Sequence, residues 1–454
     1  MPPAEQLKAQ YKRPSKLIVR KHLHMDAMLC ALYHGFCALP DPRRGKVEIP
    51  LPDALMAGFA MFSLKDPSLL AFDERRRSDG NLGRIFGIGK VPSDTQMREI
   101  LDPVDPQRLR PLFNNVFSQL QRGKALEPMA YLGGCYLLSV DGTGSFSSET
   151  LRSASCLVKK SRSGKQTYYQ QVLGAAIVHP DFKEVIPLAP EMIIRQDGSK
   201  KNDCERNAAR RFFQKLRQDH PHLPLIVVED GLSSNGPHIR ALQQHGMHYI
   251  LGAKPGDHPL LFHHIEEAAK RGELGEHSMV DPIDPKLTHV FGYLNGASLN
   301  QANLDLSVNV IDYRQRCEGK KDLHFSWVTD FTVTQDNVYQ LMRGGRARWK
   351  IENETFNTLK NQGYHFEHNF GLGRQHLSEV FVMLMMLAFL VDQTQQLTSA
   401  LFRSVWKKFG TKRSLWENVR NLFHVFELDS MEMLYTALLN GYRQPRPEIL
   451  YADP

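Results

Sequence analysis

Two acidic residues each follow a short apolar run and precede a glycine. Residues 136–145 read Tyr-Leu-Leu-Ser-Val-Asp-Gly-Thr-Gly-Ser, and residues 225–231 read Leu-Ile-Val-Val-Glu-Asp-Gly. Apolar runs of this length without polar alternation indicate strands that are buried on both faces. Such strands would end on Asp141 and Asp230 and deliver both carboxylates to the rim of a sheet. Each Asp-Gly pair by itself is also typical of a simple turn.

A third carboxylate is predicted on a helix later in the chain. Residues 346–360 read Arg-Ala-Arg-Trp-Lys-Ile-Glu-Asn-Glu-Thr-Phe-Asn-Thr-Leu-Lys. At about 100° per residue, one apolar sector of this helix contains Trp349, Phe356 and Leu359. Glu352 falls inside that sector, where a carboxylate is unfavourable unless a partner compensates it, whereas Glu354 falls on the opposite, solvent-facing side. Glu352 is therefore a functional candidate, and a purely structural ion pair with Arg348 is the alternative.

Three carboxylates of this kind suit phosphoryl chemistry assisted by two metal ions. Mg²⁺ prefers a few carboxylates together with waters and substrate phosphates. Two ions roughly 4 Å apart activate the attacking oxygen and stabilise the leaving one. The sequence contains no Walker-type glycine-rich loop, zinc-ligand spacing or Ser-His-Asp arrangement. We therefore expect Asp141, Asp230 and Glu352 to be catalytic and to bind two Mg²⁺ ions, with Mn²⁺ as an alternative.

The elements between the first two acids predict an α/β fold, an RNase H-like mixed sheet flanked by helices. After the Asp141 strand we expect strands at 168–178 and 184–194, a helix at 203–218, the Asp230 strand, a helix at 234–245 and a strand at 248–252. This β-β-β-α-β-α-β order is three strands in a meander followed by parallel strands joined by helices. In that fold the Asp141 and Asp230 strands are parallel neighbours, so their carboxylates meet at one edge.

The remaining segments predict a β-rich insertion and helical N- and C-terminal regions. Residues 304–310 alternate apolar and polar side chains, which is typical of a half-buried strand. We divide the chain into a helical DNA-binding region at 1–130, a catalytic core at 131–255 and 335–395, an insertion at 256–334 and a helical region at 396–454. Within the first region, Ser93 and Asp94 indicate the start of a helix.

Composition favours a polyanionic partner and argues against a membrane protein. The 454 residues carry 57 Lys and Arg against 49 Asp and Glu, a net charge of +8, which favours nucleic acid. The six cysteines form no Cys-x-x-Cys pair, as expected of a reduced, cytoplasmic protein. The N-terminus has no apolar signal segment. The apolar run Val380–Val391 is shorter than the roughly 20 residues that span a bilayer and predicts a buried core helix.

The three acidic blocks resemble those of bacterial insertion-sequence DDE transposases. The blocks are Asp141-Gly-Thr, Asp230-Gly, and Arg348-Trp-Lys-Ile-Glu352 followed by Lys360. The most similar group has a Tyr-Arg-Glu-Lys signature and a β-strand insertion before the Glu. The resemblance covers roughly residues 90–395. In this chain Gly345 stands where the signature Tyr is expected, and Leu359 stands where the Lys is expected.

The resemblance implies cut-and-paste transposition. Such an enzyme binds the terminal inverted repeats of its element as double-stranded DNA, cleaves with Mg²⁺ and joins the freed 3′-OH to target DNA without a covalent enzyme intermediate. A homodimer is expected because two DNA ends must be held. Two alternatives stay open: an RNase H-like nuclease without strand transfer, and a non-catalytic DNA-binding derivative. The basic flanks argue against the first alternative, and the intact acids argue against the second.

Several basic residues and one aromatic residue are candidates for DNA binding. No acidic residue occurs from Leu151 to Pro180, and a basic loop beside a metal site suits a DNA backbone; a solvated loop is the alternative. Trp327 is a candidate for stacking on an unpaired base, with packing in the core as the alternative. The basic candidates are Lys159, Lys160, Arg162, Lys165, Arg346, Arg348 and Lys360.

Overall fold

One long mixed sheet organises the structure, a computed structural model that describes residues 22–76, 79–153, 155–193 and 204–440. The strand order is β2-β3-β1-β6-β7-β11-β10-β9-β8, and β4 and β5 both pair with β3. The strands are β1 (Tyr136–Ser148), β2 (Leu157–Lys160), β3 (Gln166–Val178), β4 (Ile186–Pro187), β5 (Glu191–Ile193), β6 (Leu225–Glu229), β7 (His248–Gly252), β8 (Gly275–Val280), β9 (Leu287–Asn300), β10 (Asn303–Cys317) and β11 (Leu323–Thr329).

The central strands have the predicted RNase H-like arrangement. β1 pairs antiparallel with β3 and parallel with β6, and β6 pairs parallel with β7. Of the predicted element ends, residues 194 and 203 lie outside the described residues. In the β1–β6 ladder Ser139 pairs with Val228, and the same offset brings Asp141 level with Asp230. The predicted mixed sheet flanked by helices is therefore confirmed.

Two local predictions about the central strands were wrong. The strand that carries Asp141 does not end there, because β1 continues to Ser148 and stays paired with β3 after its pairing with β6 has ended. The segment predicted as a basic loop contains β2, which pairs with the start of β3. A turn from Ser161 to Lys165 closes this hairpin, with the Ser161 and Lys165 backbones hydrogen-bonded to each other.

The predicted insertion extends the same sheet. β11 pairs antiparallel with β7, with Val328 opposite Leu251, and β10, β9 and β8 follow in order. Burial matches the alternation in the sequence from Leu306 onward, since Leu306 and Val308 are buried while Ser307 is exposed, but Leu304 is 63% exposed. Helix α10 (Pro259–Arg271) packs against β9. The proposed domain boundaries stay a prediction, but these strands and the core share one continuous sheet.

Helices cover the two faces of the central strands. On one face, α8 (Glu205–Asp219) packs against β3 and β5, and α9 (Gly236–Gln244) packs against β7. On the other face, α11 (Val338–Ala347) crosses β7, β6 and β1. The π-helical turn η4 (Ile351–Phe356) then lies over β1 and β3, and α12 (Asn357–Asn361) follows. This second helical layer passes over the position of Asp141.

The first and last described segments form one helical body. Its centre is α13 (Leu377–Thr398), which packs against α3 and α7. Every residue from Val380 to Val391 is buried, which confirms the predicted core helix. By length and composition alone α13 could cross a membrane, but 94% of its apolar window is buried inside the protein. The other helices are α2 (Met25–Cys37), α3 (Leu51–Ser63), α4 (Leu69–Arg76), α5 (Asn81–Phe86), α6 (Asp94–Leu101), α7 (Arg110–Arg122), α14 (Ala400–Phe409), α15 (Lys412–Val425) and α16 (Met431–Asn440), with short 3₁₀ turns η1 (Pro106–Leu109), η2 (Glu127–Met129) and η3 (Leu132–Gly134).

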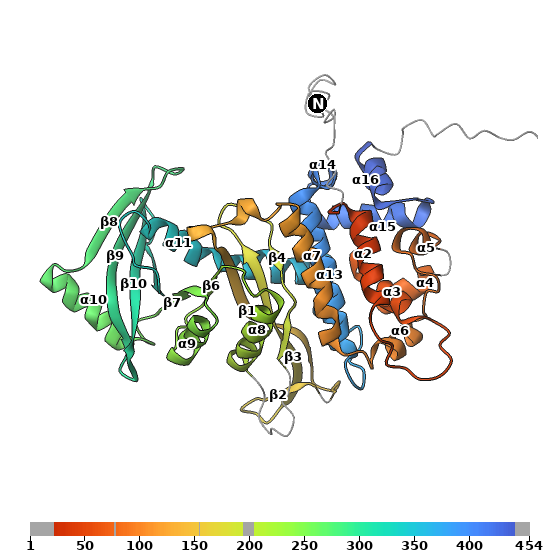
Figure 1. Cartoon of the computed structure of the whole chain (residues 1–454), viewed down its shortest axis with the longest axis horizontal. Helices are drawn as coiled ribbons and strands as arrows, with labels where there is room; N and C mark the ends of the chain where they lie inside the picture. The colour runs from red at the N-terminus through yellow and green to blue at the C-terminus, as the bar shows by residue number, and fades with distance from the viewer. Residues whose placement is uncertain (1–21, 77–78, 154, 194–203, 441–454) are drawn as a thin grey trace, which may run out of the picture.

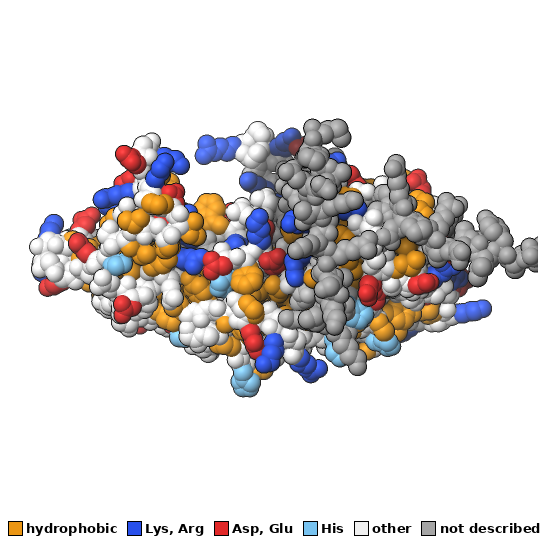
Figure 2. Space-filling view, turned by 90° about the horizontal axis from the view of Figure 1, so that it is seen from above, with side chains coloured by type: hydrophobic (Ala, Val, Ile, Leu, Met, Phe, Trp, Pro, Cys, Tyr) orange, Lys and Arg blue, Asp and Glu red, His pale blue; other side chains and the backbone are white. Residues whose placement is uncertain are grey.

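The molecule is elongated, with the helical body at one end and β8, β9, β10 and α10 at the other (Figure 1). Seen from above, basic and acidic side chains are spread along its whole length (Figure 2).

Local sequence signals account for some of the helix starts. The sequence predicted the start of α6 at Ser93 and Asp94, and there Ser93 and Gln96 form a reciprocal capping box.

A buried ion pair connects distant parts of the helical body. Lys65 is fully buried after α3, and its ammonium lies 2.6 Å from Asp392 of α13. The ammonium also donates to the Ser63 carbonyl at 2.9 Å and lies 4.1 Å from the centre of the Trp416 ring. Tyr364 donates a hydrogen bond to the same carboxylate. Both charges are thus compensated where water does not reach them.

We predict that Lys65→Met destabilises the protein by about 3–5 kcal/mol, because it leaves the Asp392 carboxylate buried without its partner. Removing both charges in Lys65→Met/Asp392→Leu should recover most of that loss. Urea unfolding of both variants measures the difference. The control is Lys90→Met, which breaks only an exposed pair with Glu48 and should change stability by less than about 1 kcal/mol. A double variant as unstable as the single one would contradict the pairing.

Candidate active site

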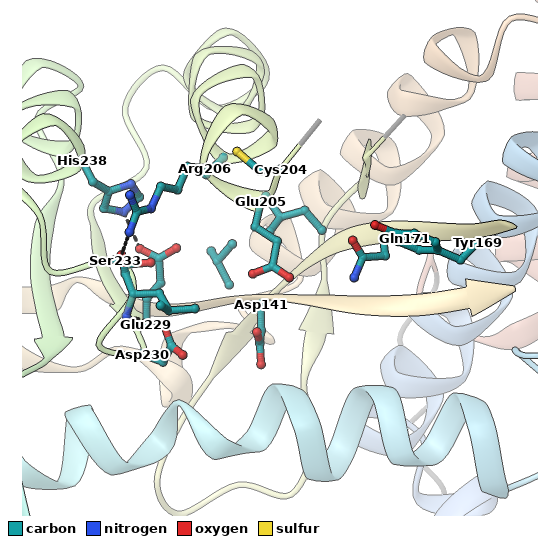
Figure 3. A pocket seen from close by; sticks show the side chains of 14 residues that line it. Asp141, Tyr169, Gln171, Cys204, Glu205, Arg206, Glu229, Asp230, Ser233 and His238 are labelled. Carbon is teal, nitrogen blue, oxygen red and sulfur yellow. Dashed lines mark hydrogen bonds and ion pairs between the residues drawn. The ribbon is translucent and has the colours of Figure 1, made fainter. Parts of the chain in front are cut away.

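Asp141 and Asp230 lie side by side on the α11 face of the sheet. Side chains alternate along a strand, so their common register gives both residues the same direction. Figure 3 shows both carboxylates pointing toward the helix below the sheet, while the neighbouring Glu229 points the opposite way. The Asp141 carboxylate accepts a hydrogen bond of 2.8 Å from the Gly142 amide, and Asp230 accepts one of 2.9 Å from Leu232. In each case a nearby backbone amide therefore holds the carboxylate in place.

The turn η4 brings Glu352 to the same edge through Arg348. The Arg348 guanidinium lies 2.8 Å from a Glu352 oxygen and 3.4 Å from an Asp141 oxygen. The carbonyl of Arg348 accepts a 2.9 Å hydrogen bond from the hydroxyl of Ser139, which is fully buried in β1 two residues before Asp141. This bond fixes the helix to the strand at the point where Glu352 must approach it.

The surroundings of Asp141 change its acidity. Burial and, to a smaller extent, the neighbouring Glu352 raise its pKa to about 7, against the opposing effects of the Gly142 amide and Arg348. This carboxyl group therefore ionises less readily than a solvated aspartate. Two carboxyl groups that compete in this way form a site where an added cation is favourable.

The donor set fits a hard cation. Asp141, Asp230 and Glu352 supply only carboxylate oxygens, and Mg²⁺ takes one or two carboxylates and completes its shell with water and phosphate. Among the described residues, no three His, Cys, Asp or Glu side chains are close enough to enclose an ion by themselves. The guanidinium of Arg348 instead supplies the positive charge between Asp141 and Glu352.

The helix around Glu352 departs from the predicted phase. Phe356 and Leu359 are buried as expected, but Trp349 is 49% exposed, so its assignment to the buried sector was wrong. The reason is the π-helical turn η4, which follows Trp349 and is wider than a regular α-helical turn. It changes the angle around the helix axis between Trp349 and the residues that come after the turn. Glu352 stays on the sheet-facing side, as predicted, where it forms an ion pair with Arg348. Glu354 is half-buried near Lys350 and Lys412 rather than fully solvated.

The basic candidates do not gather at the acids. Of them, only Arg348 contacts the candidate acids. Arg346 donates to Gln315 and lies over the ring of Phe325, both in the β10–β11 part of the sheet. Lys360 forms a 2.8 Å ion pair with Glu367. The hairpin residues are all exposed, and one of them, Lys165, pairs with Glu149 at 2.5 Å; the four are Lys159, Lys160, Arg162 and Lys165.

Trp327 is a core residue, so the prediction that it stacks on a DNA base is corrected. Its side chain is only 5% exposed and stacks on Phe325 within the sheet. It also explains the departure at Gly345, because a Cβ at that position would lie 2.6 Å from the Trp327 ring nitrogen. A Tyr at position 345 would meet this ring, and only glycine lets α11 approach β11 so closely.

A second pair of acidic residues, Glu205 and Glu229, lies on the α8 face of the sheet and was not among the predicted site residues. Glu205, at the start of α8, lies over β1 at Gly142. A Cβ added to Gly142 would lie 2.3 Å from a carboxylate oxygen of Glu205. Glu229 accepts a hydrogen bond of 2.6 Å from the His238 ring, and both residues are buried. Burial lowers the pKa of His238, but Glu229 outweighs it and the net shift is upward.

These groups line a cleft of about 540 Å³ together with Asp141 and Asp230 (Figure 3). Glu229 was visible in the sequence beside Asp230, and period-2 alternation alone assigns the two residues to opposite faces. Glu205 had no such signal, because nothing in its neighbourhood indicates that α8 begins over Gly142.

The fold and the acidic edge together define an RNase H-like protein with a candidate DDE site. The sequence matches the transposase DDE domain family over residues 140–390, which is more than half of the chain. The chain therefore belongs to this family of DNA transposases, whose members typically use divalent metal ions. A search of curated proteins found no match.

We predict that Gly345→Ala destabilises the protein although alanine favours helices by about 1 kcal/mol over glycine. The added methyl group forces the Trp327 ring to move in a packed interior, which costs about 1–3 kcal/mol. In a Trp327→Leu background the obstruction is gone, so the same change should be neutral or stabilising. Thermal unfolding of the four proteins gives the coupling. Equal effects in both backgrounds would contradict the proposed contact.

Proposed function

We propose that this protein cleaves DNA at the ends of its element with Mg²⁺ and transfers the 3′-OH into target DNA, as in cut-and-paste transposition. The observation that carries the proposal is the common register of β1 and β6. It sets Asp141 beside Asp230 on the face over which η4 carries Glu352. Family membership supplies the reaction class.

In this proposal Asp141, Asp230 and Glu352 hold two Mg²⁺ ions, with Mn²⁺ as a substitute. Bound there, the ions supply activation of the attacking oxygen and stabilisation of the leaving oxygen. The protein fixes the positions of the carboxylates and of the helix that carries Glu352. Ser139 anchors the Arg348 backbone, and the Arg348 side chain compensates Asp141 and Glu352. With both carboxylates neutralised, the Arg348 guanidinium would be available to a DNA phosphate, a group that arginine binds well.

The partner in this proposal is double-stranded DNA, as terminal inverted repeats and as target. The exposed hairpin residues supply backbone contacts, and Arg346 and Lys360 are additional candidates. A homodimer would hold the two element ends. The expected setting is the bacterial cytoplasm, at the nucleoid when DNA is bound. The net charge of +8 is consistent with this partner.

We predict that Asp141→Asn, Asp230→Asn and Glu352→Gln each abolish Mg²⁺-dependent cleavage, because an amide is a poor ligand for this ion. The assay measures nicking and strand transfer on DNA that carries the ends of the element that encodes this chain. Glu354→Gln is the matched control, since it changes a carboxylate on the same turn and should cleave at nearly the wild-type rate.

Each outcome of this assay has a distinct meaning. Cleavage retained by one of the first three variants removes that residue from the site. Loss of activity in Glu354→Gln but not in Glu352→Gln would exchange their roles. Cleavage by the wild-type protein without strand transfer would identify a nuclease, and no cleavage at all would identify a non-catalytic DNA-binding protein.

We predict that neutralising the β2–β3 hairpin flattens the salt dependence of DNA binding. Each lost phosphate contact removes roughly 0.9 from the slope of log K against log salt concentration for duplex DNA. The variant replaces Lys159, Lys160, Arg162 and Lys165 by Gln. The control removes the same charge at the far end of the sheet, at Lys270, Arg271, Lys320 and Lys321. A slope that is unchanged, or changed equally in the control, would exclude the hairpin from DNA contact.

A further inference from the structure

A groove with arginine and amide side chains runs between α8 and α9, on the face of the sheet opposite the carboxylates of Asp141 and Asp230. Its volume is about 680 Å³, and no carboxylate lines it. Its walls carry arginine and amide side chains over an apolar floor. The lining residues on which the inference rests are Arg210 and Gln214 from α8, and Arg240 and Gln244 from α9.

The groove lies next to the cleft on the α8 face, which Glu205 and Glu229 line together with Asp141 and Asp230. Arg206 lines the cleft that contains Asp141 and Asp230, and Arg210, one turn further along α8, lines the groove. On the other side, Ser233 lines the cleft and Pro237, at the start of α9, lines the groove. Both helices therefore begin at the acidic edge and lead away from it, with the positive ends of their dipoles near the cleft.

The positive charge of the groove is little compensated. Arg210 is exposed and makes no hydrogen bond or ion pair with the described residues. Arg240 donates to Asn303 at 3.0 Å and pairs with Asp305 at 2.6 Å. The Arg240 and Asp305 side chains are 42% and 75% exposed, and an exposed ion pair contributes little and is screened by salt. A polyanion could replace Asp305 at small cost. Gln214 and Gln244 add amide donors between the two arginines.

We propose that this groove binds the phosphodiester backbone of a DNA strand that extends past the catalytic edge. The proposal rests on the proposed function and adds a second surface to the candidate site, distinct from the hairpin. Arginines with amide donors and no carboxylate suit phosphate oxygens. A volume of about 680 Å³ is far larger than a single small anion, so the groove suits a polymer.

The test is DNA binding by Arg210→Gln/Arg240→Gln, measured by fluorescence anisotropy over a range of salt concentrations. Phosphate contacts are independent of sequence, so the probe is a labelled oligonucleotide of arbitrary sequence, either single-stranded or annealed to its complement. Two lost contacts should reduce the magnitude of the slope by roughly 1.8 for duplex DNA or roughly 1.4 for a single strand. The probe with the larger loss of affinity identifies which form of DNA occupies the groove.

The matched control is Arg271→Gln/Arg413→Gln, which removes the same charge from exposed positions on α10 and α15. It should leave the slope near that of the wild-type protein. Slopes that stay equal in all three proteins, or fall equally in both variants, overturn the groove proposal. The assay omits Mg²⁺ and involves no cleavage, so a wild-type protein that binds with a steep slope but never cleaves would refute the proposed function and leave the groove standing.

Discussion

The parallel register between β1 and β6 is the constraint on which the candidate site depends. β6 ends on Glu229, Asp230 follows it directly, and successive side chains along an extended chain point to opposite faces. The observed register directs Asp230 to the face of Asp141 and directs Glu229 to the buried pair with His238. A slip by one residue would exchange them, leaving Glu229 toward η4 and Asp230 in a place shaped for a histidine partner. The Glu229–His238 pair thus favours the same register that aligns Asp141 and Asp230.

Charge balance at the edge then depends on Arg348. Asp141 is partly buried next to Glu352, and like charges this close oppose ionisation. The guanidinium that bridges them stabilises the carboxylates in the absence of a stronger cation. Its backbone is tied to Ser139 rather than to its ionic partners. The side chain can therefore leave the carboxylates without releasing the helix, so the protein can exchange one positive charge for another at this point.

The sequence predicted the sheet and the three acids because each is encoded locally. Continuous apolar runs fix the buried strands, and Arg348 and Glu352 are related by the i, i+4 spacing of a helix. What it could not predict depends on contacts between distant segments. β1 continues past Asp141 because β3 remains available as a partner, and Trp349 is exposed because a π-helical turn breaks the regular phase. Glu205 came to the cleft only through the placement of α8, for which no local pattern exists.

The insertion illustrates how such distant contacts support the site. β11 continues the core sheet, and its Trp327 lies against Gly345 of α11 so closely that no side chain fits between them. One residue later, Arg346 lies over Phe325 of the same strand. Two residues further along the helix comes Arg348. The insertion therefore fixes the segment immediately before the residues that approach Asp141, and a displacement of β11 would move Arg348 and Glu352 with it. In this chain the glycine that stands in place of the signature Tyr at position 345 thus allows the insertion to pack directly against the helix that leads to Glu352.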